Sequence, residues 1–180
     1  MNSRKTRNIV IAVGVILLSV AIDRITKIIV MKHMTLGQSI PSGNHFISLY
    51  YTRNTGIAFS LFDDTAGARW ALAGIQAVLV VIIIVIMVVI LMRETRVLTS
   101  VAFALMLGGG IGNLIDRIAY GSVTDFVSVG SFPVFNFADS CLTVGCAVLI
   151  VYLLFFSQPD NRGTAGTTDE PGNPGGSSSA

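Results

Sequence analysis

The segment from Trp70 to Met92 has no charged side chain, and it constrains the fold of this chain more than any other feature. As an α-helix it is about 34 Å long at 1.5 Å per residue, which is enough to cross the roughly 30 Å hydrocarbon core of a bilayer. Lipid offers the backbone no hydrogen-bonding partner, so a segment in that environment has to be helical. The sequence therefore predicts a transmembrane helix here.

The rest of the chain has the same apolar character. Of its 180 residues, 52% are hydrophobic and 12% are charged, against roughly 25% charged residues in soluble domains. This composition excludes a disordered chain and a soluble enzyme, and the net charge of +2 is too small to indicate a nucleic-acid partner. We predict a membrane all-α protein with four transmembrane helices, at about 9–30, 70–92, 97–115 and 135–156.

Basic residues are distributed unevenly between the two sides of this four-span arrangement. Six lie in short segments on the side of the termini, and four lie in longer segments on the other side. Because basic residues concentrate in cytoplasmic segments, both termini are predicted to be cytoplasmic. The first span has a basic start, as a cleavable signal peptide would have. It is not followed by a small-residue cleavage site and a soluble domain, so we interpret it as a transmembrane span that is retained in the protein.

The segments outside the spans differ in character. In the extracytoplasmic loop 31–69, two aromatic and β-branched runs, at 45–52 and 57–62, flank an Asn-Thr-Gly turn and predict a small β-sheet within this first loop. The stretch 116–134 is expected to be a short loop after the third span. Residues 157–180 are rich in Gly, Pro, Ser and Thr, which predicts a disordered cytoplasmic tail beyond a 1–156 membrane domain.

Four carboxylates lie near or within apolar segments, all toward the predicted outer face: Asp23, Asp116, Asp125 and Asp139. Ionisable groups at such depth are costly, so each is a candidate functional residue. Asp23 and Lys27 have the i, i+4 spacing of a helix-surface ion pair, which is a sufficient structural explanation. Asp116 and Arg117 are similarly explained by a local ion pair or a cap where the third span ends.

Asp125 and Asp139 are harder to explain structurally. Asp125 lies in the apolar stretch 123–127, and Asp139 lies about one turn into the fourth span. The intervening segment 130–133 can turn the chain back, so the two side chains could meet. Two close carboxylates do not both ionise easily, and one then acts as base while the other acts as acid, as aspartic proteases require. An ion or proton pathway is the competing interpretation of this pair.

Other polar residues have structural explanations of their own. The asparagines Asn54, Asn113 and Asn136 could satisfy buried backbone groups, and Gly108 with Gly112 forms a small-residue face for close helix contact. The chain has two histidines and two cysteines, so a catalytic metal has no plausible ligand set. No cofactor is predicted.

Four motifs, taken in order, resemble a known family. They are Asn54–Ser60 (NTGIAFS), Gly112–Arg117 (GNLIDR), Tyr120–Phe126 (YGSVTDF) and Phe132–Ser140 (FPVFNFADS). Together with Asp23-x-x-x-Lys27, they resemble lipoprotein signal peptidase (signal peptidase II) over about residues 9–156. The departures from the family pattern are modest and concern the shape of the substrate pocket: Ile57, Thr124, Phe137 and Cys141.

The resemblance implies a membrane aspartic endopeptidase of the bacterial inner membrane, with its site at the extracytoplasmic face. We expect it to be a monomer without cofactor or metal. Its substrate is a prolipoprotein that is cleaved N-terminal to a diacylglyceryl-cysteine, within membrane lipid. The catalytic pair maps to Asp125 and Asp139. The polar residues that shape the site map to Asp23, Asn54, Asn113, Asp116, Arg117 and Asn136.

Two other classes of function compete with this interpretation. A small ion- or proton-coupled transporter would use the four carboxylates as a relay, but it predicts carboxylates spread through the bilayer depth. A non-catalytic membrane adaptor leaves the costly carboxylates unexplained. A presenilin-like protease is disfavoured because its Gly-x-Gly-Asp motif is absent, since Gly110-Ile-Gly112 continues to Asn113.

Overall fold

The computed structural model describes residues 3–41, 43, 46–56, 66–93 and 96–156. In these residues the chain forms four long helices and one three-stranded sheet. Three features of the sequence interpretation lie outside the described residues: the tail 157–180, the apolar run 57–62 that includes Ile57, and His45.

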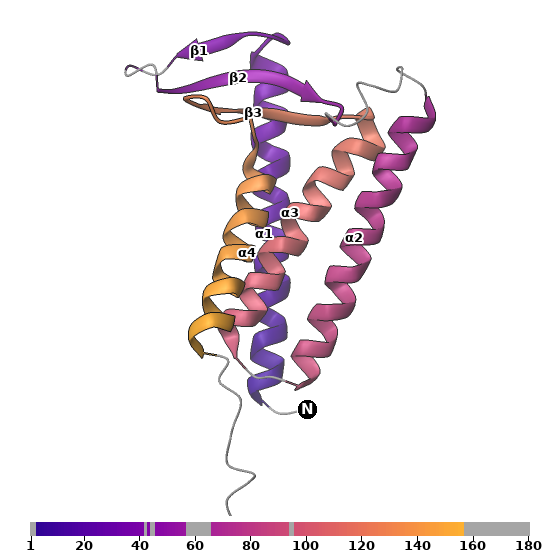
Figure 1. Ribbon diagram of the computed structural model, residues 1–180, viewed down its shortest axis with the longest axis vertical. Coiled ribbons are helices and arrows are strands. Elements are labelled where there is room, and N and C mark those ends of the chain that lie inside the picture. Colours follow the sequence, from indigo (N-terminus) through magenta and orange to yellow (C-terminus); the bar gives the residue numbers. More distant parts are fainter. Residues whose placement is uncertain (1–2, 42, 44–45, 57–65, 94–95, 157–180) are drawn as a thin grey trace, which may run out of the picture.

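The four helices are each long and apolar enough to cross a membrane, which confirms the predicted four spans. They are α1 (Ser3–His33), α2 (Ala66–Arg93), α3 (Val97–Tyr120) and α4 (Phe137–Phe156). Their directions alternate, so the beginning of α1 and the end of α4 lie at the same end of the bundle, and the sheet lies across the other end (Figure 1).

Helix α3 packs against the other three helices and forms the centre of the bundle. The predicted small-residue face explains this position. A Cβ atom at Gly108 would lie 2.7 Å from the Cβ of Ser19 on α1, and one at Gly112 would lie 2.6 Å from an Asp23 oxygen. Gly109 faces α4, where a Cβ would contact the carbonyl oxygen of Ala138. Without side chains at these positions, α1 and α4 approach the backbone of α3 closely.

The sheet is antiparallel with strand order β1-β2-β3, and its strands are β1 (Ser39–Pro41), β2 (Ile47–Asn54) and β3 (Val123–Val129). The prediction of a sheet confined to the first loop is therefore wrong in part, because β3 comes from the chain after α3. Gly121, with a φ of 70°, ends α3 and turns the chain toward the sheet. The β-branched residues that follow then pair with β2.

Two helix boundaries also differ from the prediction. Helix α3 continues past residue 115 to Tyr120, since nothing between Gly112 and Tyr120 breaks a helix, so Asp116 and Arg117 are helical rather than in a loop. Helix α4 begins at Phe137 rather than at Phe135. Phe135 instead exchanges backbone hydrogen bonds with Val127 at 2.8 and 3.0 Å, which ties the chain to β3 just before α4 starts.

Candidate active site

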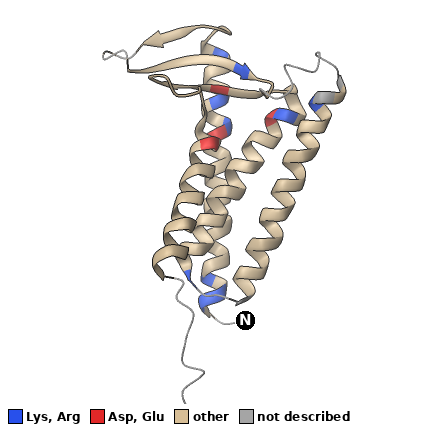
Figure 2. Ribbon diagram, in the orientation of Figure 1, with Lys and Arg blue, Asp and Glu red and all other residues tan. Residues whose placement is uncertain are grey.

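The carboxylates of the described residues gather at the end of the bundle that carries the sheet (Figure 2). They are the four that the sequence singled out: Asp23 on α1, Asp116 on α3, Asp125 on β3 and Asp139 on α4. Four different elements thus bring their carboxylates to one end of the molecule. These four side chains lie at one end of the bundle rather than being spread along its length.

Two of the carboxylates form a buried ionic cluster with two cations of α1. Lys27 Nζ lies 3.0 Å from Asp23 Oδ2 and 3.1 Å from Asp116 Oδ2. Arg24 lies 2.9 Å from Asp23 and 2.7 Å from Asp116. The predicted Asp23–Lys27 pair is confirmed. Of the two explanations offered for Asp116 and Arg117, a local ion pair or a cap, the ion pair is wrong. Successive helical residues point about 100° apart, and Asp116 faces α1.

Asp23 and Asp116 also hold in place the backbone next to the other two carboxylates, Asp125 and Asp139. The Thr124 N–H donates to Asp116 Oδ2 at 2.9 Å, at the start of β3. The Ala138 N–H donates to Asp23 Oδ1 at 3.2 Å, in the first turn of α4. Asp23 and Asp116 therefore anchor the residues immediately before Asp125 and Asp139.

Asp125 is buried on β3, with 2% of its surface exposed. Its two oxygens accept hydrogen bonds from Asn54 Nδ2 at 3.0 Å and Asn136 Nδ2 at 2.7 Å. Burial raises the pKa of Asp125 to about 6, and the nearby charge of Asp139 adds to this, while the two amide donors oppose it. Asp125 therefore holds a proton at a higher pH than an ordinary aspartate.

Asp139 lies in the first turn of α4 and forms a reciprocal cap with Asn136. The Asp139 N–H donates to Asn136 Oδ1 at 3.0 Å, and the Asn136 N–H donates to Asp139 Oδ2 at 3.2 Å. This is the geometry of a capping box, with Asn and Asp in place of the usual residue types. The other oxygen of Asp139 accepts from Asn113 Nδ2 at 2.7 Å. The carboxylate is thus held in one orientation.

Asn136 connects the two carboxylates. Its side-chain amide donates to Asp125 while its backbone N–H donates to Asp139, so one buried residue positions both groups. The asparagines that were expected to satisfy buried backbone groups do so only in part. Asn54 and Asn136 each accept one backbone N–H, but the N–H2 groups of Asn54, Asn113 and Asn136 all face carboxylates.

Arg117 is placed differently from the other predicted site residues. It interacts electrostatically with Asp116, Asp125 and Asp139. Within the described part of the chain, however, its guanidinium makes no hydrogen bond or ion pair with them. Arg117 instead lines a pocket together with Arg69 and Trp70, at the adjoining end of α2. Sequence reasoning assigned Lys27 only to Asp23 and missed its bond to Asn113, which arises from the packing of α1 on α3.

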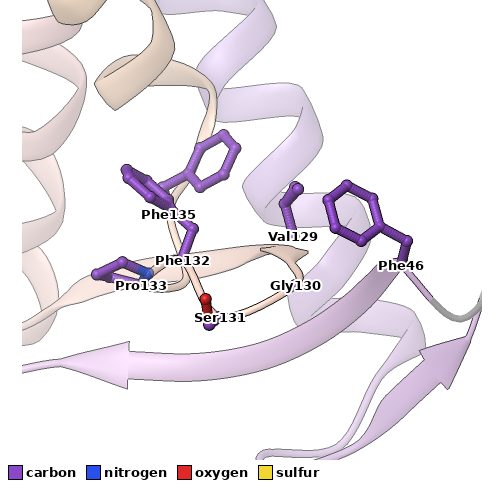
Figure 3. Close-up of a pocket in the computed structure, with 7 residues that line it drawn as sticks. All are labelled: Phe46, Val129, Gly130, Ser131, Phe132, Pro133 and Phe135. Carbon is purple, nitrogen blue, oxygen red and sulfur yellow. The ribbon is translucent and has the colours of Figure 1, made fainter.

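Two apolar grooves lie near the sheet, and one of them reaches a carboxylate. One lies at the turn after β3, where Phe46 and Val129 face Phe132 and Phe135 across the groove (Figure 3). The other has a volume of about 560 Å³ and shares Phe132 and Phe135 with the first. This second groove reaches Asp139 and extends along α4 to Thr143 and Val144. A mainly apolar path therefore leads along α4 to the carboxylate of Asp139.

Known proteins resemble this chain in sequence and in fold. The family model described as signal peptidase (SPase) II matches residues 15–155. A lipoprotein signal peptidase of Geobacillus thermodenitrificans (strain NG80-2) is 38% identical over 145 residues, 78% of this chain and 88% of that protein. One of Shouchella clausii (strain KSM-K16) is 36% identical over 151 residues, 83% of this chain and 97% of that protein. A bacterial membrane enzyme solved by the in meso method at 1.9 Å resolution superposes with a TM-score of 0.69 at 28% identity, covering 81% of this chain and 94% of that structure.

Fold, buried carboxylates and these matches together define the class of protein: a bacterial multi-pass membrane peptidase of the aspartic type. The extent of the matches settles the family. The chain belongs to the signal peptidase II family.

Proposed function

We propose that this protein hydrolyses the peptide bond N-terminal to the diacylglyceryl-cysteine of prolipoproteins and releases the signal peptide, with Asp125 and Asp139 as the catalytic pair. Family membership supports the activity. The single observation that supports the pair is that Asn136 donates to both carboxylates, next to a groove that opens along α4. A carboxyl with a raised pKa beside a second carboxyl is what an acid–base pair requires.

In the proposed mechanism, one aspartate is ionised and the other is protonated. The ionised carboxylate takes a proton from water as the water oxygen attacks the scissile carbonyl. The protonated carboxyl donates its proton to the amide nitrogen, so the C–N bond breaks and an amine leaves. Because burial raises the pKa of Asp125 to about 6, we assign the shared proton to Asp125 and the role of base to Asp139.

The groove beside Asp139 suggests how a lipidated substrate reaches the pair. Val144 on α4 is 50% exposed on the side surface of the bundle, and Phe132 is 64% exposed at the sheet end. Acyl chains entering sideways from the bilayer would contact these apolar groups before the cysteine reaches the carboxylates. We therefore propose that the diacylglyceryl group contributes binding energy in this groove.

The remaining proposals concern the setting of the enzyme. We propose a monomer in the bacterial inner membrane, with both termini cytoplasmic, the sheet and site at the extracytoplasmic face, and 157–180 as a cytoplasmic tail. Among the described residues, the carboxylates gather at one end rather than through the bilayer depth (Figure 2). The transporter alternative, which predicts a relay across the membrane, therefore has no support.

The test is cleavage of a diacylglyceryl-modified prolipoprotein by the purified protein. Asp125→Asn and Asp139→Asn, made separately, are each expected to lower kcat by roughly a thousandfold, as loss of general acid or base catalysis does. Mass spectrometry of the released peptide checks that cleavage occurs N-terminal to the modified cysteine. Near-normal turnover by either folded variant would show that the pair is assigned wrongly.

Three controls accompany this experiment. Asp160→Asn changes a carboxylate outside the family-matched residues 15–155 and should leave turnover unchanged. A metal chelator should have no effect. The unmodified prolipoprotein should be processed poorly, because it lacks the acyl contacts; equal rates with and without the lipid would contradict the substrate assignment.

A further inference from the structure

Lys27 has three polar contacts in a fully buried position. Its ammonium forms ion pairs with Asp23 Oδ2 and Asp116 Oδ2 and donates a hydrogen bond to Asn113 Oδ1 at 3.0 Å. A lysine ammonium has three N–H groups and no acceptor. Charge pairing explains the contacts of Lys27 with the two carboxylates. Its hydrogen bond to a neutral amide, which leads toward Asp139, needs a separate explanation.

The bond from Lys27 determines which way the Asn113 amide faces. Because Lys27 can only donate, the atom of Asn113 next to it has to be the carbonyl oxygen. The same oxygen also accepts from Asn136 Nδ2 at 3.1 Å. The N–H2 group of Asn113 is thereby left to face Asp139, and it donates to Asp139 Oδ1 at 2.7 Å.

We propose that Lys27 is a positioning residue for the hydrolytic reaction: it holds the Asn113 amide in the orientation in which an N–H group, rather than a carbonyl oxygen, faces Asp139. This inference rests on the proposed role of Asp139 as a catalytic carboxylate. Lys27 is not among the residues that line the groove at Asp139, and its side chain is 0% exposed. It therefore acts through Asn113 and does not touch the substrate.

The orientation matters because the two faces of an amide have opposite effects on a carboxylate. An N–H donor favours the ionised form, whereas a carbonyl oxygen in the same place repels it. Asp139 also interacts electrostatically with Arg117 on α3 and with Asp125 on β3. Further charged groups at this end of the bundle are those of the ionic cluster: Asp23, Arg24 and Lys27 on α1 and Asp116 on α3. A test therefore has to separate the effect of the Asn113 amide on Asp139 from the effects of the nearby charges.

Lys27→Met tests the proposal, and Arg24→Met is its matched control. Arg24 pairs with the same two carboxylates, Asp23 and Asp116, but makes no bond to Asn113. Both variants remove one cation from the cluster. Lys27→Met is expected to lower kcat about tenfold with KM within about twofold, and to move the acidic limb of the pH–rate profile up by roughly one unit. Arg24→Met removes a cation but no bond to Asn113, so it should move that limb by clearly less.

A double-mutant cycle separates action through Asn113 from a direct effect of the Lys27 charge. If Lys27 acts through the amide, its effect on the acidic limb disappears in an Asn113→Ala background, because there is no amide left to orient. A shift of equal size in both backgrounds would overturn the proposal. A limb shift in Arg24→Met equal to that in Lys27→Met would overturn it as well.

Two further comparisons keep the test decisive if Lys27→Met does not fold. Lys27→Met combined with Asp23→Asn leaves Arg24 and Asp116 as a balanced pair, and it is compared with Asp23→Asn alone. Asn113→Ala by itself should reproduce the shifted limb, and an unchanged profile in that variant would contradict the proposal. If Asp139→Asn retains full turnover, the proposed catalytic pair fails instead, so the two failures are distinguishable.

Discussion

At the residue scale, the orientation of the asparagine side chains at this site is set by groups that can donate a hydrogen bond but cannot accept one. The oxygen of Asn54 accepts from the Gly56 N–H, and the oxygen of Asn136 accepts from the Asp139 N–H. Backbone N–H groups, like the Lys27 ammonium, have no acceptor capacity. Each of these donors turns an amide so that its N–H2 group faces a carboxylate. The site is therefore built to hold negative charge where burial opposes it.

The raised pKa of Asp125 predicts a specific dependence of stability on pH. Its value of about 6 in the folded protein lies above the roughly 3.9 of an unfolded aspartate. Between these values the folded protein binds more protons, so its stability falls as pH rises through this window and stays low above it. Asp125→Asn cannot ionise and should gain relative stability over the same window, by up to about 3 kcal/mol.

Thermal unfolding in detergent at about pH 4.5 and about pH 7.5 measures this difference. The Tm of Asp125→Asn minus that of the unmodified protein should be larger at the higher pH. Asp160→Asn serves as the comparison and should show no such change. A difference that does not vary with pH would mean that Asp125 is not the buried carboxyl described here.

At the scale of elements, the glycines of α3 decide how closely its neighbours approach. Gly108 and Gly112 face α1, while Gly109 faces the first turns of α4. The carboxylate of Asp23 contacts the glycine face itself, since a Cβ at Gly112 would lie 2.6 Å from it. The same close packing that joins the helices therefore brings the charged residues of α1 within reach of α3 and α4.

Gly109→Ala is expected to separate α3 from α4 and to lower both stability and turnover. The added methyl group would contact the backbone oxygen of Ala138 and lie 3.0 Å from Leu142 Cγ. Backbone cannot rotate away as a side chain can, so overpacking of this kind costs about 1–3 kcal/mol. We expect a fall in Tm of several degrees, measured by thermal unfolding.

Gly14→Ala on α1 is the matched control for this change. Nothing lies within 4 Å of a Cβ built at Gly14, so an alanine there should be tolerated or slightly stabilising, as expected for a helix interior. Equal losses in the two variants would show that helix propensity, rather than the α3–α4 contact, is responsible.

At the scale of the whole molecule, the bundle has one polar end that the sheet covers and an apolar flank. Helix α2 packs mainly on α3, and few of the residues in its apolar window are buried inside the molecule. The sheet lies across the end where the four carboxylates gather (Figures 1 and 2). Such an arrangement suits a substrate that has one part in lipid and a scissile bond at the membrane surface.

The orientation of this bundle in the membrane can be measured by cysteine labelling. Ser39→Cys on β1 and Thr6→Cys near the start of α1 each place a cysteine at an exposed position, at opposite ends of the molecule. In a Cys141→Ala, Cys146→Ala background, an impermeant maleimide should label residue 39 in intact spheroplasts and residue 6 only after lysis. The reverse pattern would place the sheet in the cytoplasm.

The spans and the carboxylates could be predicted because the signals for them are local. A segment such as 70–92 partitions into lipid by its own composition, whatever the rest of the chain does. The cost of placing Asp23, Asp125 or Asp139 among apolar residues is equally visible from their immediate neighbours. For the same reason, the four ordered motifs predicted the family, whose membership the comparisons confirmed.

The partners of those carboxylates were decided only by the tertiary structure. Asp116 pairs with Arg24 and Lys27 on a distant helix rather than with its neighbour Arg117, and β3 joins a sheet begun in the first loop. Such contacts depend on where glycines let helices approach and on where a strand finds an open edge. Sequence by itself determined what must be buried in this protein; packing between distant segments determined what each buried charge contacts.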